Sequence, residues 1–319
     1  MHSIDVFNGD ADGICALVQL RLHSPRPNAR LVTGVKRDIR LLDRLIEVVN
    51  SEITVLDISL DRNREDLDRL LAAGNHVLYI DHHYSGPLPA SSRLDARIDL
   101  SPLVCTALLV DRMLAGQYSS WAIAGAFGDN LDEIASTYAE ENGFNAETIR
   151  SLHEVGLLLN YNGYGSSLND LLAHPADLFA EALCFDDPLV FHRDSSLLQK
   201  IRRGYQDDME RVADVQPTRI GPTGRVFQLP EADWARRVVG VFSNQIARDR
   251  PDMAHAVLIA NQDSSWLVSV RAPLANRHGA DDLCRQFPTG GGRAGAAGIN
   301  RLDLQDLESF ISLFFRHFS

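Results

Sequence analysis

The stretch Val77-Leu78-Tyr79-Ile80-Asp81-His82-His83 joins a short apolar run to three side chains that can bind a metal ion. The apolar residues are typical of a buried strand, and packing gives no reason to end such a strand in a carboxylate and two imidazoles. Ligand sites of open α/β sheets lie at the carboxyl ends of the strands. We therefore expect Asp81, His82 and His83 at the ligand-binding edge of a parallel sheet.

Three other apolar segments end in the same way. Ile4-Asp5-Val6-Phe7 leads into Asn8-Gly9-Asp10-Ala11-Asp12-Gly13, and Ile53-Thr54-Val55-Leu56 leads into Asp57. The apolar run from residue 121 to 127 is a candidate fourth strand, and it leads into Gly128-Asp129-Asn130. Each ending alone is more often a plain turn or a helix cap. Together they bring a carboxylate from each of four elements to one rim, which predicts a metal site.

The ligand types favour manganese or magnesium. Carboxylate, imidazole and water ligands suit Mn²⁺ and Mg²⁺, whereas structural zinc prefers clustered thiolates. The four cysteines (Cys15, Cys105, Cys184, Cys284) are far apart and show no CxxC spacing. We therefore expect reduced thiols rather than a disulfide framework or a zinc knuckle.

The amino-acid composition narrows the classes of molecule that the protein is expected to bind. The 319 residues are 45% hydrophobic, and the formal net charge of −12 argues against a protein that coats long DNA or RNA through a basic surface. A short phosphorylated substrate remains compatible, because bound divalent ions supply local positive charge. The sequence shows neither a signal-peptide pattern nor an apolar stretch near the ~18 residues of a membrane span. We expect a cytoplasmic protein without membrane contact, and a homodimer is an open alternative to a monomer.

The pattern along the chain predicts two α/β domains. In residues 1–130, apolar runs alternate with helical patterns at 14–22, 39–49 and 64–73, which is typical of a parallel sheet with helices on both faces. Residues 131–210 are mainly helical, with a polar loop expected at 160–167 and a long charged helix at 197–215.

The last third of the chain predicts a smaller α/β domain with a mixed sheet. Strands are expected within 218–229, at 254–260 and at 266–271, followed by a closing helix at 304–318. The domain boundaries that we predict are 1–185, a helical linker at 186–215, and 216–319.

At this point the residues resemble a known family. The segment Asp10-Ala11-Asp12-Gly13, then Asp57, Asp81-His82-His83 and Asp129 resemble, in order and spacing, the motifs of the DHH phosphoesterase superfamily. The stretch Gly290-Gly291-Gly292-Arg293-Ala294-Gly295-Ala296-Ala297-Gly298 resembles the GGGHxxAAG motif of its C-terminal DHHA1 domain. The resemblance covers nearly the whole chain and implies an active site in the cleft between the two domains.

The resemblance also implies roles for these residues. Two Mn²⁺ ions, with Mg²⁺ as an alternative, would lie in the first domain. Asp10 would bind one ion, the set Asp12, His82 and Asp129 would bind the other, and Asp57 would bridge them. The catalytic residues would be Asp57, Asp81 and His83, with Asp81 orienting neighbouring ligands and His83 contacting a substrate phosphate. The substrate would also be held by Gly290, Gly291, Gly292 and Arg293.

Two positions depart from the family pattern. Many relatives carry a histidine ligand where this chain has Asn8, whose carbonyl oxygen is a candidate but weaker ligand. Arg293 replaces the usual histidine of the glycine-rich motif, and it keeps a phosphate-binding role with a permanent charge. Lys36-Arg37-Asp38 follows a probable strand, so its cations can face the same rim, and Arg37 is a further candidate phosphate contact.

These expectations converge on a Mn²⁺-dependent phosphodiesterase of the nanoRNase or oligonucleotide phosphodiesterase kind. Two ions that share a water can activate it for attack on phosphorus. The expected substrates are short: nanoRNA, or linear or cyclic dinucleotides, and no long nucleic acid. Three alternatives stay open. They are a phosphomonoesterase acting on a bisphosphorylated nucleotide, a non-catalytic nucleotide-binding regulatory protein built on the same scaffold, and an enzyme of sugar-phosphate or nucleotide-sugar chemistry.

Overall fold

The structure is a computed structural model that describes residues 2–261 and 263–319. The chain divides into two compact units, one ending at Gly204 and the other beginning at Tyr205. The division falls inside helix α9 (Ser196–Ala213), which is the long charged helix expected at 197–215. The finer boundaries at residues 185 and 215 stay predictions, as does the cleft between the domains.

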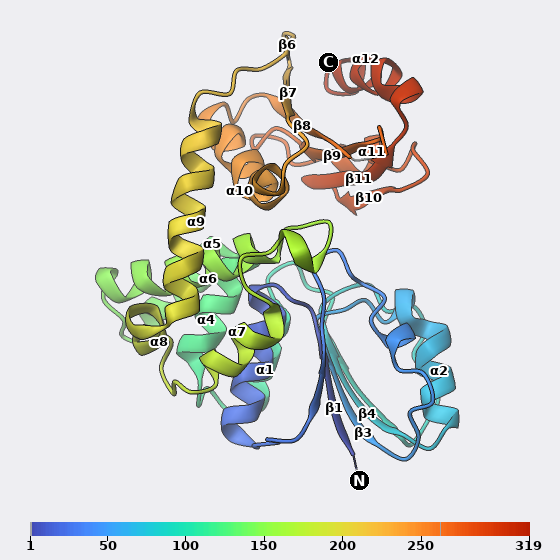
Figure 1. Ribbon diagram of the computed structural model, residues 1–319, viewed down its shortest axis with the longest axis vertical. Coiled ribbons are helices and arrows are strands. Elements are labelled where there is room, and N and C mark those ends of the chain that lie inside the picture. Colours follow the sequence, from blue (N-terminus) through green and yellow to red (C-terminus); the bar gives the residue numbers. More distant parts are fainter. Residues whose placement is uncertain (1, 262) are drawn as a thin grey trace. The chain divides into compact units, whose positions relative to one another are not determined.

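The first unit contains an all-parallel sheet. Its strands run in the order β2-β1-β3-β4-β5. Their bounds are β1 Ser3–Phe7, β2 Arg30–Val32, β3 Glu52–Leu56, β4 His76–Asp81 and β5 Leu94–Ile98. Helices cover both faces of this sheet, with α1 (Ala11–His23) on one side and α2 (Arg64–Ala72) on the other (Figure 1). The predicted parallel sheet flanked by helices is confirmed.

The register places three strand ends at one level. Phe7 of β1 pairs with Leu56 of β3, which pairs in turn with Ile80 of β4. The residues that follow these rungs therefore emerge side by side at the carboxyl edge of the sheet. The strand order also reverses at β1, so the neighbouring β1 and β3 form the topological switch point where open α/β sheets bind ligands.

The strands read as nearly continuous apolar runs because both faces of the sheet are covered. The core on one face includes Val6, Val55 and Tyr79, packed against Leu67 and Leu70 of α2. This packing fixes the strand ends, and with them the side chains that follow.

After β5 the chain of the first unit is mainly helical. The helices are α3 Thr106–Met113, α4 Ser119–Gly128, α5 Asp132–Glu141, α6 Ala146–Gly163, α7 Pro175–Ala182 and α8 Pro188–Asp194. The strand predicted over residues 121–127 is wrong, because this segment forms α4. Its residues are buried on all sides, so the apolar run has no periodicity that distinguishes a helix from a strand.

Glycines let α4 pack closely on its neighbours. A Cβ atom on Gly128 would lie 2.2 Å from the Ala11 Cβ of α1 and 2.9 Å from the Gly156 carbonyl oxygen of α6. The helix therefore ends close to the start of α1, and Asp129 is its C-cap residue.

Two local predictions are corrected. The helix expected at 39–49 is an irregular segment with one 3-10 turn at Leu42–Arg44. There the Asn63 side chain accepts from the Leu42 N–H and donates to the Ile39 carbonyl, so a side chain replaces helical hydrogen bonds. The loop expected at 160–167 begins later, since α6 continues to Gly163.

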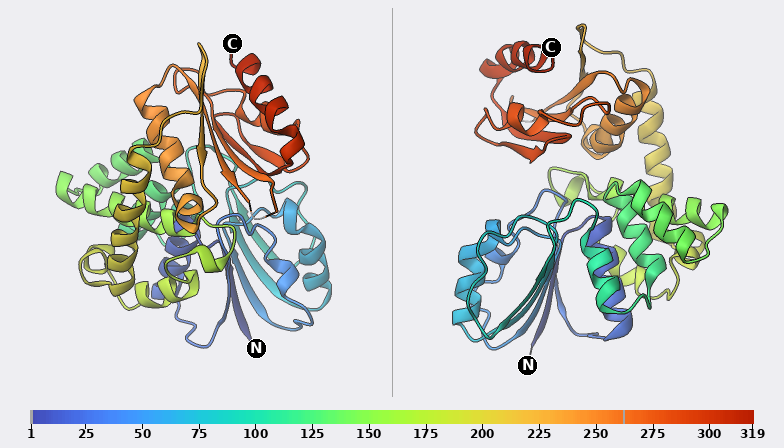
Figure 2. Two further views of the ribbon diagram at one scale, coloured as in Figure 1. Left: turned by 45° about the horizontal axis from the view of Figure 1, so that its top comes forward. Right: turned by 180° about the vertical axis from the view of Figure 1, so that it is seen from behind.

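The second unit is an α/β domain with a mixed sheet, as predicted. Its strand order is β10-β11-β9-β8-β7-β6, in which β7 and β8 are parallel and the other neighbours are antiparallel. The strands are β6 Arg219–Ile220, β7 Gly224–Leu229, β8 Ala254–Ala260, β9 Trp266–Arg271, β10 Gly290–Arg293 and β11 Ala296–Leu302. Helices α10 (Asp233–Asp249) and α12 (Leu307–His317) lie on opposite sides of this sheet, and α11 spans Ala280–Cys284 (Figure 2).

The glycine-rich motif forms an edge hairpin of this second sheet. Gly290 pairs with Ile299, and Arg293 pairs with Ala296 across a short turn. Among the described residues, no helix is both long and apolar enough to cross a membrane.

Candidate metal centre

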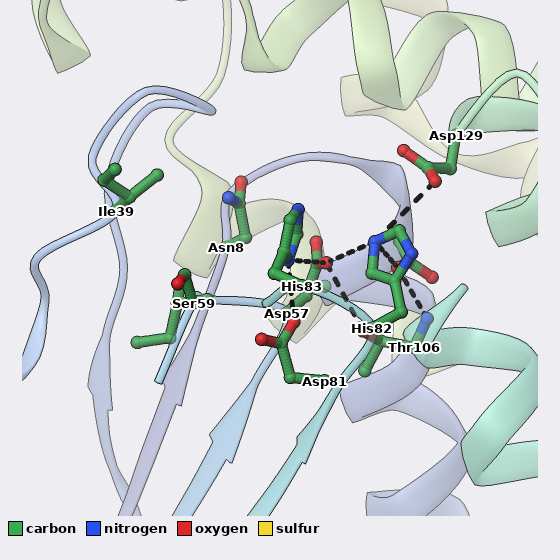
Figure 3. Close-up of polar contacts among 12 residues, drawn as sticks. Asn8, Ile39, Asp57, Ser59, Asp81, His82, His83, Thr106 and Asp129 are labelled. Carbon is green, nitrogen blue, oxygen red and sulfur yellow. Dashed lines mark hydrogen bonds and ion pairs between the residues drawn. The ribbon is translucent and has the colours of Figure 1, made fainter. Parts of the chain in front are cut away.

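Carboxylates and imidazoles converge at the carboxyl edge of the first sheet. Figure 3 shows Asp57, His82, His83 and Asp129 pointing toward one another above the ends of the strands. Ligand atoms of Asp57, His82 and His83 all lie within 4.8 Å of one another. The structure thus brings together residues from β3, β4 and α4 that are far apart in the sequence.

His82 has the environment of a metal ligand. Its ring is buried, and its Nδ1 lies 3.0 Å from the Val104 carbonyl oxygen, which accepts a proton but cannot donate one. In the neutral ring, Nε2 therefore carries the lone pair. Such a second hydrogen bond is what orients a metal-binding histidine.

Three carboxylates surround this Nε2 atom. It lies 3.5 Å from an Asp57 oxygen, 3.7 Å from an Asp129 oxygen and 3.8 Å from an Asp12 oxygen. Nε2 is buried and has no hydrogen-bond partner among the residues that the structure describes. The buried lone pair and the three carboxylates all need a positive partner. A cation bound between them would satisfy all four groups, so a cation fits this position.

Backbone and hydroxyl donors hold two of these carboxylates. The Asp12 oxygens accept from the N–H groups of Thr106 and Ala107, at 2.8 and 2.7 Å, at the start of α3. The Thr106 hydroxyl donates to Asp57 at 3.3 Å. Asp57 itself has a φ of 59°, a left-handed conformation that is uncommon for a residue other than glycine. Such strain is often stored at functional sites.

Burial and mutual repulsion make these carboxylates costly to ionise without a cation. Burial, followed by the charges of Asp12 and Asp10, raises the pKa of Asp57 well above its usual range. Burial also raises the pKa of Asp12, although the nearby His82 opposes this shift. A divalent cation would offset both effects, so the donor set and its electrostatics fit the metal that the sequence predicted.

The second histidine is held differently. The fully buried Asp81 places an oxygen 2.7 Å from His83 Nδ1, and the same nitrogen lies 3.8 Å from Asp57. The His83 side chain remains 38% exposed. Asp81 therefore positions His83, which leaves part of that ring open to solvent beside the carboxylates.

At the end of β1, the surroundings of Asp10 differ from those of the other aspartates. Asp10 Oδ1 caps α1 by accepting from the N–H groups of Asp12 and Gly13, at 3.1 and 3.2 Å. Its Oδ2 accepts from the Lys36 ammonium at 2.6 Å. Asn8 accepts from the Asp10 N–H through its side-chain oxygen. The metal-binding roles predicted for Asp10 and Asn8 stay predictions.

Sequence reasoning underrated three residues at this site. Lys36 was noted only as one cation of the segment after a probable strand, and Asn160 only as the start of a polar loop. Thr106 was not noted. The position of Lys36 just beyond β2, next to β1, was the available signal. Arg37 is half-buried, and burial lowers the pKa of its guanidinium. Its phosphate contact stays a prediction, as do the substrate contacts of Gly290, Gly291, Gly292 and Arg293.

Comparison with known proteins yields structural likeness alone. No protein-family model matches the chain, and no curated protein matches it. The exonuclease RecJ bound to manganese is similar with a TM-score of 0.60 and 16% identity, over 98% of this chain and 89% of that chain. RecJ from Thermus thermophilus in complex with Mn²⁺ gives 0.62 and 18%, over 98% of this chain and 51% of that one.

A third solved structure has nearly the same length as this chain. The pGpG-specific phosphodiesterase PggH from Vibrio cholerae has a TM-score of 0.58 and 12% identity, over 98% of each chain. At these identities the likeness is one of fold. Together with the strand order and the two α/β units, these matches show that the chain shares the fold of RecJ and PggH.

Proposed function

We propose that this protein is a divalent-metal-dependent phosphoesterase that hydrolyses phosphodiester bonds of short nucleotide substrates. One observation carries the proposal: the buried His82 Nε2 faces oxygens of Asp12, Asp57 and Asp129 at 3.5 to 3.8 Å. This arrangement lies at the switch point of a parallel sheet, where α/β proteins bind their ligands.

The proposed centre assigns a task to each side chain. Asp12, Asp57, His82 and Asp129 would hold the metal. A bound divalent ion supplies Lewis-acid activation of water and neutralises charge on phosphate oxygens. Mn²⁺ is the first choice and Mg²⁺ the second, in keeping with the oxygen and imidazole ligands.

His83 is the proposed phosphate contact. In its imidazolium form both ring nitrogens donate, Nδ1 to Asp81 and Nε2 to a phosphate oxygen. Because Asp81 is fully buried and fixes the ring, the donor is oriented before the substrate arrives. In the second unit, Gly290, Gly291, Gly292 and Arg293 are the proposed contacts for the far part of the substrate.

The proposed substrate class is a linear dinucleotide or a similarly short oligonucleotide. The acidic chain, with a net charge of −12, is poorly suited to long polyanions. A neighbour in fold of nearly equal length is a pGpG-specific phosphodiesterase, which supports short substrates. A phosphomonoesterase acting on a bisphosphorylated nucleotide is the second activity to test.

A non-catalytic nucleotide-binding protein is the competing function. The observation that favours it is the ion pair between Lys36 and Asp10, because that carboxylate is then engaged by a protein cation. The two functions differ in turnover, so one experiment separates them.

The experiment is hydrolysis of a substrate panel with Mn²⁺ or Mg²⁺. The panel contains pGpG, pApA, short 5′-phosphorylated RNA, cyclic di-AMP, 3′-phosphoadenosine 5′-phosphate and pyrophosphate. The variants Asp57→Asn and His82→Ala test the centre. His76→Ala is the matched control, since this exposed histidine lies at the opposite end of β4.

Turnover of a dinucleotide that both centre variants abolish and His76→Ala retains would support the proposal. Nucleotide binding without turnover, unchanged in both centre variants, would contradict it and favour the regulatory function.

A further inference from the structure

We propose that the Lys36 ammonium replaces one of the two metal ions of the family, so that the centre binds a single divalent ion. This ion is held by Asp12, Asp57, His82 and Asp129, while Lys36 neutralises Asp10. The inference rests on the proposed metal site and states how many ions that site takes.

Asp10 is already satisfied by the protein. Its Oδ1 accepts two backbone N–H groups at the start of α1, and its Oδ2 lies 2.6 Å from Lys36 Nζ. The Asp10 side chain is 4% exposed and the Lys36 side chain 23%, so the carboxylate end of the ion pair is buried. In contrast, the lone pair of His82 Nε2 has no hydrogen-bond partner among the described residues. The structure thus offers a ready cation at Asp10 and a place for one at His82.

Lys36 is held in a built ammonium site. Its Nζ also donates to the buried Asn160 side-chain oxygen at 2.8 Å and lies 5.6 Å from the centre of the Tyr164 ring. Its backbone N–H donates to the Gly163 carbonyl oxygen at 2.9 Å. A solvated surface lysine usually lacks such contacts. These contacts hold both the backbone and the ammonium group of Lys36 in place.

Asn8 contributes to the same arrangement. Its side-chain nitrogen donates to the Lys36 carbonyl oxygen at 3.2 Å, and its side-chain oxygen accepts from the Asp10 N–H at 3.2 Å. Both ends of the amide are therefore committed to positioning Lys36 and Asp10. The asparagine in place of the family's histidine removes a strong ligand for the first ion and also supports the cation that replaces it.

The test counts bound ions instead of measuring turnover. Metal-free wild-type protein is titrated with Mn²⁺, bound metal is measured by elemental analysis after desalting, and the electron paramagnetic resonance spectrum is recorded. We expect one Mn²⁺ per chain and the spectrum of an isolated ion. Two ions per chain, or the spectrum of a coupled pair, would overturn the inference while leaving the proposed function intact.

Two single variants separate the two positions. Asp10→Asn keeps a good helix cap and is expected to retain one ion, with less than a tenfold loss of affinity. His82→Ala is expected to lose more than a hundredfold. Equal losses in the two variants would mean that Asp10 is a ligand, and that result overturns the inference. A wild-type protein that binds no Mn²⁺ overturns both the inference and the proposed metal centre.

A double variant tests the replacement directly. Asn8→His with Lys36→Ser restores the family's ligand and removes the competing cation, so we expect two ions and the spectrum of a coupled pair. If this variant folds, as judged by circular dichroism, and still binds one ion, then Lys36 and Asn8 are not what excludes the other ion and the inference fails.

Discussion

Replacing Asp57 by asparagine is expected to stabilise the metal-free protein and to remove most of its response to metal. Asp57 is buried, and burial together with the charges of Asp12 and Asp10 raises its pKa well above the usual range. A carboxyl group with a raised pKa in the folded state holds its proton more tightly when folded. The metal-free protein therefore loses stability as the pH rises from about 4, the ordinary aspartate value, to the raised value.

The distances in the centre set the size of the effect. Oxygens of Asp57 and Asp12 lie 3.5 and 3.8 Å from His82 Nε2, so the two oxygens are at most about 7.3 Å apart. Two unit charges at ~7.3 Å, with an effective dielectric constant of about 20, repel each other by ~2 kcal/mol. Asp129 lies equally close to His82 and adds a similar repulsion when it is ionised.

We therefore expect Asp57→Asn to raise the free energy of unfolding of the metal-free protein by about 2 to 4 kcal/mol at pH 8. Asparagine also tolerates the left-handed backbone at this position, where φ is 59°. For a unit of roughly this size, ~1 kcal/mol shifts the melting temperature by about 2 to 4 °C. The expected rise is at least about 4 °C.

The assay is thermal unfolding of the wild type, Asp57→Asn and the control Asp43→Asn, an exposed aspartate outside the site. In EDTA at pH 8, Asp57→Asn should melt above the wild type and Asp43→Asn should match it. Near pH 4 the gain should disappear. With Mn²⁺ at 100 times the dissociation constant, the wild type should gain about 2.7 kcal/mol and Asp57→Asn much less. A lower melting temperature for Asp57→Asn in EDTA at pH 8, or an equal gain near pH 4, would refute the reasoning.

Three other predictions concern the same region. Asp81→Asn weakens the hydrogen bond that orients the His83 ring. We therefore expect kcat to fall about 10- to 100-fold while the Mn²⁺ affinity stays unchanged. A wild-type kcat in this variant would contradict the positioning role of Asp81. Gly128→Ala places a methyl group against Ala11. The free energy of unfolding measured by chemical denaturation should therefore fall by about 1 to 3 kcal/mol. An unchanged denaturation midpoint would mean that α4 is not tightly packed. Burial raises the pKa of Asp12, and a protonated carboxyl binds metal poorly. The Mn²⁺ dissociation constant measured by calorimetry should therefore increase as the pH falls toward the raised pKa, starting above the ordinary aspartate range. A dissociation constant that stays unchanged down to that range would exclude this coupling.

Most of the sheet and its strand ends could be predicted from the sequence, because each strand is an apolar run that stops at a polar side chain. The residues Asn8, Asp57 and Asp81 emerge together because the rungs of β1, β3 and β4 are in register, and a parallel sheet brings its carboxyl ends to one edge. The order of the strands needs tertiary information, but the chemistry at their ends does not.

The wrong predictions fall in two segments whose hydrophobic pattern does not reveal their structure. The run before Asp129 is apolar on every side, so its helix α4 was predicted as a strand. Asp129 still reaches the site, because its position depends on where the element ends and on the close packing at Gly128. At residues 39–49, three leucines at helical spacing are buried by an irregular segment, whose backbone is satisfied by the Asn63 side chain.

The sequence places Lys36 after a probable strand, but that signal does not distinguish it from its neighbours, because spacing in a loop does not tell which side chain points inward. Its partners Asp10 and Asn160 are 26 and 124 residues away. Sequence reasoning treated Asn8 as a weakened ligand. In the structure, the Asn8 side chain instead donates to the Lys36 carbonyl oxygen and accepts from the Asp10 N–H.

Charge balance shows what this arrangement requires of the rest of the site. Asp10, Asp12, Asp57 and Asp129 carry four negative charges when ionised, and two divalent ions would cancel them. Lys36 and a single divalent ion supply three positive charges, which leaves the centre negative toward an anionic phosphodiester. Permanent cations of the protein would suit that task better than titratable groups, which is why Arg293 stays in the set of proposed substrate contacts. On the proposal of a single ion, the pair of Asn8 and Lys36 thus moves one positive charge from an exchangeable ion to the protein itself.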